Sequence, residues 1–310
     1  MLIGTTIPNT GALARGTAAV EVALHAEQVG FDSAWTVDHL ILPETSTETY
    51  PYTRQPGVTL TPSWPFLDPL VTLGAAASVT KKLLLGTGVY LLPLRHPVAV
   101  AKQAASVDLL SGGRLRFGVG LGWVREEYRV MGIAWEQRGR IFDEQIDTLR
   151  RLWRDDRPAL PGRYASDVVF GFEPKPLQGD IPLLIGGMNP AARQRAAARG
   201  DGWHIIDVEA GEVAGHIADL RADCQAAGRV PTAVPVSMYA SLTITDRDVA
   251  PADRAFPLMG SLAQVKDTMQ AYRAAGLDHL VLAPRALSDV AEYRRQLDAV
   301  ANHLLPGLRS

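Results

Sequence analysis

The chain of 310 residues is 47% hydrophobic and 21% charged, which is typical of a folded globular protein and argues against a disordered one. Its 31 basic and 33 acidic side chains give a formal net charge of −2, so neither nucleic acid nor an anionic membrane is an expected partner. The single cysteine, Cys224, excludes an intramolecular disulfide, and the lack of a signal-like start or of an apolar run of about 20 residues predicts a cytoplasmic protein.

In the first half of the chain, short apolar runs alternate with longer segments of helical period. Strands are expected at residues 2–7, 33–37, 83–90 and 115–120. Helices are expected to follow them at residues 17–29, 68–79, 97–110 and 137–153. Gly30 stands where the first helix would end, and Asp68 can cap the second. A long loop, residues 40–66, separates the second strand from its helix.

Residues 155–181, rich in Pro and Gly, interrupt this alternation and are expected to form an insertion with a short hairpin around residues 168–170. The pattern then resumes, with strands expected at 183–185, 203–206, 236–244 and 280–282 and helices at 190–199, 212–227, 261–275 and 288–303. Eight strand–helix units predict a closed (β/α)8 TIM barrel with insertions after strand 2 and before strand 5, formed as one domain by residues 1–310. A doubly wound open sheet is the alternative fold.

In such a barrel, chemistry takes place at the carboxyl ends of the strands. His39 follows the second strand beside Asp38, where an imidazole can donate or accept a proton near neutral pH. A partly buried histidine that caps a loop is the alternative interpretation. No cluster of His and carboxylate residues at other strand ends accompanies this pair, so no metal site is expected.

Glycines gather at three other strand ends. Gly88 ends the third strand, where a glycine indicates a bulge, a close approach by a ligand or simply tight packing. The run 111–123 holds glycines at alternate positions, but it lacks the G-x-G-x-x-G spacing, so a dinucleotide loop is excluded. Gly186 and Gly187 precede a helix whose free N–H groups favour an anion, which makes a phosphate site or an ordinary turn the two interpretations.

Together these segments resemble the luciferase-like monooxygenase superfamily, whose members are (β/α)8-barrel oxidoreductases that use FMN or the deazaflavin coenzyme F420. The most specific match runs from Leu110-Ser111-Gly112-Gly113-Arg114 to Gly122, with Trp123 and Glu126-Glu127 after it. The segments 31–39, 86–89 and 200–203 also fit. Within the superfamily, residues 120–128, 131–133 and 138–140 are most similar to F420-dependent oxidoreductases of the actinobacterial type.

The resemblance implies a role for each matching residue. It makes His39 the catalytic proton donor or acceptor, places Asp38 against the deazaflavin ring, and makes the Gly88–Val89 bond a non-prolyl cis peptide that backs the ring. It also makes Gly186 and Gly187, with the helix that follows, the holder of the coenzyme phosphate. The remaining strand-end residues expected in the coenzyme site are Gly120, Gly122, Asn189 and Ile206.

Two departures from the family pattern bear on the substrate. Alcohol and sugar-phosphate dehydrogenases of this family have a catalytic Glu where this chain has Trp123, and a Trp in the loop that here reads His39-Leu40-Ile41-Leu42-Pro43-Glu44. Both departures favour reduction of an unsaturated substrate over alcohol oxidation. Trp123 is expected to form an apolar wall and Trp64 a lid, which suits a largely apolar organic molecule.

The expected protein is therefore an F420-dependent oxidoreductase in which hydride moves between the deazaflavin C5 and a small organic substrate. An FMN-dependent monooxygenase, a non-catalytic flavin-binding barrel and a metal-dependent barrel hydrolase are the alternatives. Because members of the family are often dimers that bury outer helices, a homodimer is expected as well.

Overall fold

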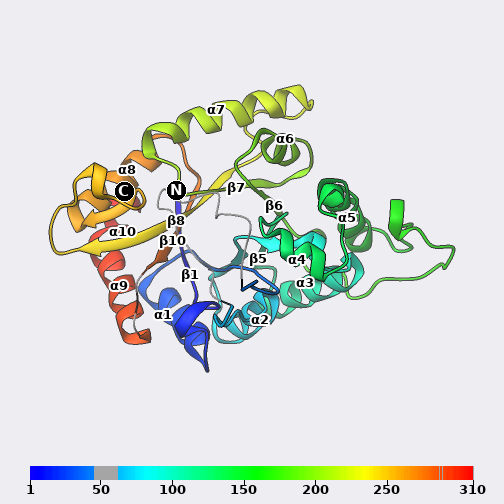
Figure 1. Cartoon of the computed structure of the whole chain (residues 1–310), viewed down its shortest axis with the longest axis horizontal. Helices are drawn as coiled ribbons and strands as arrows, with labels where there is room; N and C mark the ends of the chain where they lie inside the picture. Colours follow the sequence, from blue (N-terminus) through cyan, green and yellow to red (C-terminus); the bar gives the residue numbers. More distant parts are fainter. Residues whose placement is uncertain (45–61, 286, 288, 310) are drawn as a thin grey trace.

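The chain closes into a parallel barrel. The computed structural model describes residues 1–44, 62–285, 287 and 289–309, so residues 45–61 of the expected loop 40–66 and residue 288 of the last expected helix lie outside the described residues. Within them, β10 pairs in parallel with both β1 and β8, which joins the two ends of the sheet (Figure 1). The eight barrel strands are β1 (Leu2–Thr6), β2 (Ser33–Thr36), β3 (Leu84–Thr87), β5 (Leu115–Gly120), β6 (Leu183–Gly186), β7 (Gly202–Ile206), β8 (Val236–Thr245) and β10 (His279–Pro284). The TIM-barrel prediction is confirmed, and the open sheet is wrong.

All eight expected helices are present outside the barrel. They are α1 (Ala18–Val29), α2 (Pro69–Val79), α3 (Pro97–Ser111), α5 (Arg138–Arg154), α6 (Pro190–Arg199), α7 (Ala210–Ala226), α8 (Leu262–Ala274) and α9 (Val290–His303). The predicted signals act at their ends: Gly30 ends α1 in the left-handed region at φ 96°, and Asp68 caps α2 by accepting hydrogen bonds from the N–H groups of Leu70 and Val71, both at 3.0 Å.

Besides short 3₁₀ turns, α4 (Arg125–Val130), β9 (Leu258–Ser261) and α10 (Leu305–Arg309) were not expected from the sequence, and β4 (Tyr90–Leu91) overlaps the expected strand 83–90 only at Tyr90. β4 pairs with the end of β5, and β9 pairs with the last four residues of β8, so both extend the carboxyl side of the barrel. α4 follows β5 directly and therefore lies where a functional side chain would be placed.

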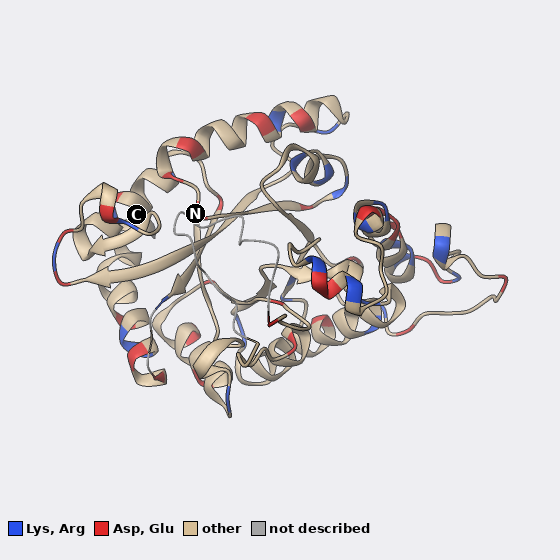
Figure 2. Ribbon diagram, viewed as in Figure 1, with Lys and Arg blue, Asp and Glu red and all other residues tan. Residues whose placement is uncertain are grey.

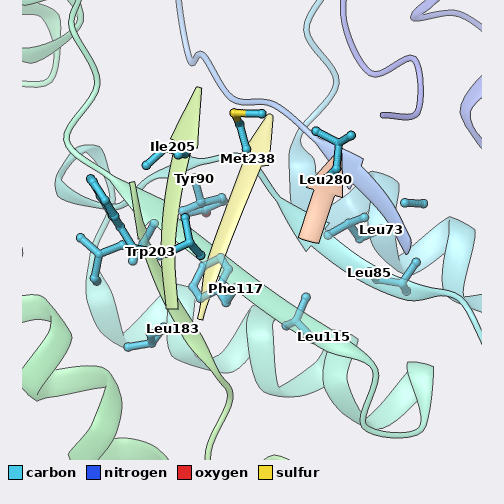
Figure 3. Close-up of a cluster of buried hydrophobic side chains, with 14 of the residues drawn as sticks. Leu73, Leu85, Tyr90, Leu115, Phe117, Leu183, Trp203, Ile205, Met238 and Leu280 are labelled. Carbon is cyan, nitrogen blue, oxygen red and sulfur yellow. The ribbon is translucent and has the colours of Figure 1, made fainter. Parts of the chain in front are cut away.

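The main core lies between the strands and the outer helices. Figure 3 shows part of it, with Leu85, Phe117, Ile205, Met238 and Leu280 fully buried on neighbouring strands. A second, smaller cluster of Trp35, Leu184 and Val281 lies on the other face of the strands, inside the barrel.

Polar side chains share this interior. The indole Nε1 of Trp35 donates to Ser33 Oγ at 2.7 Å, and Ser33 Oγ lies 2.7 Å from His279 Nε2. The Trp35 ring also stacks on His204 with the ring centroids 5.0 Å apart. These contacts fix the positions of the side chains inside the barrel, on the amino side of the strand ends where a site is expected.

A buried arginine ties together the amino end of the barrel. Gly112 ends α3 in the left-handed region, and the chain then enters β5 at Arg114. The Arg114 guanidinium donates to the carbonyls of Ala77, Thr80 and Leu83 and so satisfies carbonyl groups at and after the end of α2. The most family-specific motif, which starts at Leu110, therefore begins near the amino end of β5, whereas Gly120 ends the strand.

Two expectations about strands were wrong. The continuous strand 83–90 is interrupted after Thr87, because the Gly88–Val89 peptide bond is cis and pairing resumes only in β4. The hairpin around residues 168–170 does not form: within 155–181 the regular structure is one short 3₁₀ turn, Gly162–Tyr164. Val168 and Val169 are 64% and 78% exposed, and within this apolar run only Phe170 packs against the core, so a hairpin here would have little covering surface to stabilise it (Figure 1).

The outer surface carries both signs of charge. Figure 2 shows blue and red segments interspersed along most of the outer helices, whereas the charged side chains of α6 are all arginines. Among the described residues, no helix combines the length and apolar character needed to cross a membrane.

Candidate functional site

A cavity of about 540 Å³ opens at the carboxyl ends of the barrel strands. His39, Trp64 and Trp123 line it, and so do all nine residues expected in the coenzyme site. The sequence therefore predicted a set of residues that the fold brings together from five strand ends and the long loop.

His39 is held by a buried carboxylate. Its Nδ1 lies 2.9 Å from Glu127 Oε2, and the Glu127 side chain, on α4, is 1% exposed. Phe66 and Trp123 approach the imidazole edge-to-face, with centroid distances of 5.4 and 5.9 Å. The ring is thus fixed from three sides, and Nε2 is the nitrogen left for a bound molecule. Glu127 belongs to the family motif, but no signal in the sequence shows that Glu127, and not the adjacent Glu126, points toward His39.

The carboxylate of Asp38 binds an arginine that sequence analysis missed. Arg95 donates to both of its oxygens, from Nη1 at 2.6 Å and Nη2 at 2.9 Å, and the Leu91 N–H donates to Oδ2 at 2.8 Å. The Asp38 side chain is 1% exposed, and this burial raises the pKa of the carboxyl group although Arg95 opposes the effect. Asp38 lines the cavity, but its carboxylate oxygens serve this ion pair, which anchors the loop after β2 to the segment after β4.

The Gly88–Val89 bond is cis, as the resemblance implies, and the Val89 side chain packs into a slot made by glycines. A Cβ on Gly120 would lie 2.5 Å from Val89 Cγ2, and a Cβ on Gly186 would lie 2.6 Å from Val89 Cγ1. Both distances are well below the 3.5–4.0 Å of ordinary carbon contacts. These two glycines therefore make room for Val89, while Gly118 is required because a Cβ there would lie 1.9 Å from the Thr87 carbonyl oxygen. Close packing thus explains both glycines of β5 without a dinucleotide loop.

His204 supports the same segment from inside the barrel. A Cβ on Gly88 would lie 2.8 Å from His204 Nε2, and His204 Nδ1 lies 2.8 Å from Ser237 Oγ. Burial lowers the pKa of His204 to about 4, so the imidazole is neutral at pH 7. Sequence analysis assigned His204 only to a strand, because a single histidine in an apolar run gives no sign of which face it occupies.

The start of α6 forms the wall next to this slot. Asn189 caps the helix by accepting a hydrogen bond from the Ala192 N–H at 2.8 Å, so its amide oxygen is engaged. Gly187 has a φ of 123°, and a Cβ there would lie 2.9 Å from Ala192 Cβ, which leaves the backbone bare at the helix start. Arg138 and Arg195 line the same cavity. The cavity therefore holds two guanidinium groups as well as the N-terminus of α6, where the helix dipole is positive.

Gly122 and Ile206 complete the predicted set. Gly122 has a φ of 76°, and a Cβ there would approach Leu91 Cδ2 to 3.1 Å, so glycine is required by conformation. Ile206 ends β7 and precedes Asp207, whose φ of 45° is unusual for a residue other than glycine. Neither residue has a polar side chain, so both contribute shape to the cavity.

A polar cluster lies on the β7, β8 and β10 side of the cavity. Ser241 donates its N–H and Oγ–H to the two carboxylate oxygens of Asp207, at 2.7 and 2.9 Å, and Arg285 donates to Ser241 Oγ. Burial raises the pKa of Asp207. In the described part of the chain, no group of three His, Cys, Asp or Glu side chains converges as a metal ion would require.

Comparison with known proteins agrees with this architecture. A family model described as luciferase-like monooxygenase matches residues 2–305. An uncharacterised protein of Mycobacterium tuberculosis is 36% identical over 184 residues, 59% of this chain and 63% of that protein. An F420-dependent glucose-6-phosphate dehydrogenase of Amycolatopsis mediterranei is 31% identical over 188 residues, 59% of this chain and 51% of that protein. The chain thus aligns with less than two thirds of the length of each of these relatives.

Two solved structures share the fold over the full chain. Monooxygenase RslO1 from Streptomyces bottropensis superposes with a TM-score of 0.78 at 22% identity, covering 99% of this chain and all of the other. An F420-dependent secondary alcohol dehydrogenase superposes with a TM-score of 0.75 at 21% identity, covering 100% and 99%. Because the family model spans nearly the whole sequence, the chain belongs to the luciferase-like monooxygenase family.

Proposed function

We propose that the protein is an F420-dependent oxidoreductase acting on a largely apolar organic substrate. The observation that carries the proposal is that a histidine held through Nδ1, a side-chain wall at Val89 and a positive helix end line one cavity. The family match and the relatives named as F420-dependent support the choice of coenzyme.

The residues present fit the coenzyme. The bare backbone at Gly187, the start of α6 and the nearby Arg138 and Arg195 suit a phosphate-bearing, anionic tail. Val89, held in its glycine slot, offers an apolar wall for a flat ring. When bound, F420 would supply a hydride donor or acceptor at C5.

The chain's own residues would supply the proton and the environment. With Nδ1 tied to Glu127, His39 gives up or takes a proton at Nε2 as a substrate atom is reduced or oxidised. Trp64, Phe66 and Trp123 form apolar walls that exclude water and bind an apolar substrate. Reduction of an unsaturated substrate is the favoured direction.

Coenzyme binding tests this proposal directly. Titration of the purified protein with F420 and with FMN, followed by ligand fluorescence, should show saturable binding of F420. Binding of FMN with no measurable binding of F420 would reverse the assignment in favour of an FMN-dependent monooxygenase; the fold neighbour RslO1 is named a monooxygenase.

His39→Ala tests the role of the imidazole. The variant should bind F420 nearly as well as the parent, because the predicted tail contacts are elsewhere in the cavity. Its turnover should be lower by about two to four decades, the usual contribution of a positioned acid or base. Turnover equal to that of the parent would refute the role of His39, and tight F420 binding with no hydride exchange in the parent would indicate a non-catalytic barrel.

A further inference from the structure

The Glu127 carboxylate contacts both the His39 side chain and the backbone that follows it. Oε2 lies 2.9 Å from His39 Nδ1, while Oε1 accepts hydrogen bonds from the N–H of Leu40 at 2.8 Å and the N–H of Ile41 at 3.4 Å. Glu127 is on α4, 88 residues further along the chain, and its side chain is almost completely buried. One carboxylate therefore fixes the position of the imidazole and of the loop that carries it.

This contact also decides which imidazole nitrogen carries the proton. An ionised carboxylate can only accept hydrogen bonds, and the other partners of Glu127 are both N–H donors. His39 Nδ1 must then be the donor, which leaves Nε2 of the neutral ring with its lone pair. Among the described residues, none bonds Nε2, and His39 lines the cavity.

We propose that Glu127 is the positioning residue of the proton-transfer step, acting through His39; this inference rests on the proposed function. During reduction, bound reduced F420 would supply a hydride, and with it two electrons, for a new C–H bond at one atom of the substrate double bond. The displaced π pair at the other atom takes a proton from His39 Nε2, and the imidazolium returns to the neutral Nδ1–H form. Glu127 stabilises the imidazolium before transfer and exchanges no proton with the substrate.

Replacing the Glu127 carboxylate by an amide tests whether its hydrogen bond to His39 matters or only its packing. In Glu127→Gln the side-chain volume is retained, but the amide can donate to Nδ1 and so favour the Nε2–H tautomer of the neutral ring, and it no longer stabilises the imidazolium that gives up the proton during reduction. Glu126→Gln makes the same chemical change one residue earlier and serves as the matched control. Glu127→Asp retains a carboxylate and tests whether the charge is what matters.

The first measurement needs no coenzyme. In protein labelled with ¹⁵N-histidine, the signal of His39 is assigned by its loss in His39→Gln, and its ring ¹⁵N shifts report the tautomer. We expect Nδ1–H in the parent, Glu126→Gln and Glu127→Asp, and a shift toward Nε2–H in Glu127→Gln. A parent protein with His39 in the Nε2–H form overturns the inference, even if Glu127→Gln fails to fold.

The second measurement is steady-state oxidation of reduced F420 with 2-cyclohexen-1-one, a small apolar enone, as the probe substrate. Glu127→Gln should lower kcat by about two to four decades with little change in KM for the coenzyme, and Glu127→Asp should recover part of the loss. A Glu127→Gln variant with parental kcat overturns the inference. If the tautomers are as expected but the parent neither binds nor turns over F420, the proposed function fails while the positioning of His39 by Glu127 stands.

Discussion

The glycine slot around Val89 yields a prediction that can be worked through quantitatively. In Gly120→Ala the new methyl group would lie 2.5 Å from Val89 Cγ2, about 1 Å closer than carbon atoms normally approach. Gly120 is not in the left-handed region, so alanine is opposed by this contact and not by backbone conformation. Overpacking of this kind costs about 1–3 kcal/mol, and we expect Gly120→Ala to lower the free energy of unfolding by about 2 kcal/mol.

A second substitution should relieve the first. Val89→Ala removes both γ-methyl groups, including Cγ2, which the added alanine methyl would strike; because Val89 is only partly buried, that change alone should cost about 1 kcal/mol. In the double variant the added methyl occupies part of the vacated space, so the combined loss should be smaller than the sum of the single losses by about 1–2 kcal/mol.

Urea unfolding followed by circular dichroism measures all three variants against the parent. Gly215→Ala is the matched control, since a Cβ there meets no atom within 4 Å on the exposed face of α7, and it should be neutral or stabilising by up to about 1 kcal/mol. Strictly additive losses in the double variant would refute the reasoning, because they would mean that the added methyl and the Val89 side chain do not compete for the same space.

Two further variants test the buried charges. Arg95→Met leaves the buried Asp38 carboxylate without its cation and should cost about 3–5 kcal/mol at pH 7. Because the pKa of Asp38 is already raised and rises further without Arg95, the deficit should shrink as the pH falls and the group takes up a proton; urea unfolding at pH 5 and pH 7 checks this, and an equal deficit at both values argues against it. His204 has its pKa lowered to about 4, so its contribution to stability is complete above about pH 6.5 and is lost as the pH falls toward 4. Between pH 6.5 and 4, the free energy of unfolding of His204→Phe should therefore fall by about 3 kcal/mol less than that of the parent. Parallel curves of unfolding free energy against pH for the two proteins would contradict this.

The order of barrel elements could be predicted from the sequence because each signal is local. Buried parallel strands give short apolar runs, and residues such as Gly30 and Asp68 end or begin the helices between them. The hairpin around Val168 could not be judged in this way, since an apolar run predicts a strand only where another surface covers it. The break after Thr87 followed from family resemblance, not from apolar pattern.

The cavity residues could be predicted as a group, because parallel strands in a barrel bring their carboxyl ends together. Their contacts could not, since these join distant parts of the chain. Arg95 binds Asp38 across 57 residues and Glu127 reaches His39 across 88, and neither residue differs in the sequence from an ordinary surface charge. The glycines of β5 were recognised as unusual, but the reason for them is the close approach of Thr87 and Val89 on the neighbouring segment, which the sequence does not reveal.

The clamp formed by Arg114 bears on how this barrel can change over evolution. Arg114 ties down the strand entrances, whereas the walls that would contact a substrate stand at the strand exits, a full strand length away. Substitutions at the exits therefore need not weaken the entrances, because changes at well-separated sites act nearly independently on stability. The walls of the cavity can therefore be altered by substitution while the anchor at the entrance of β5 stays intact.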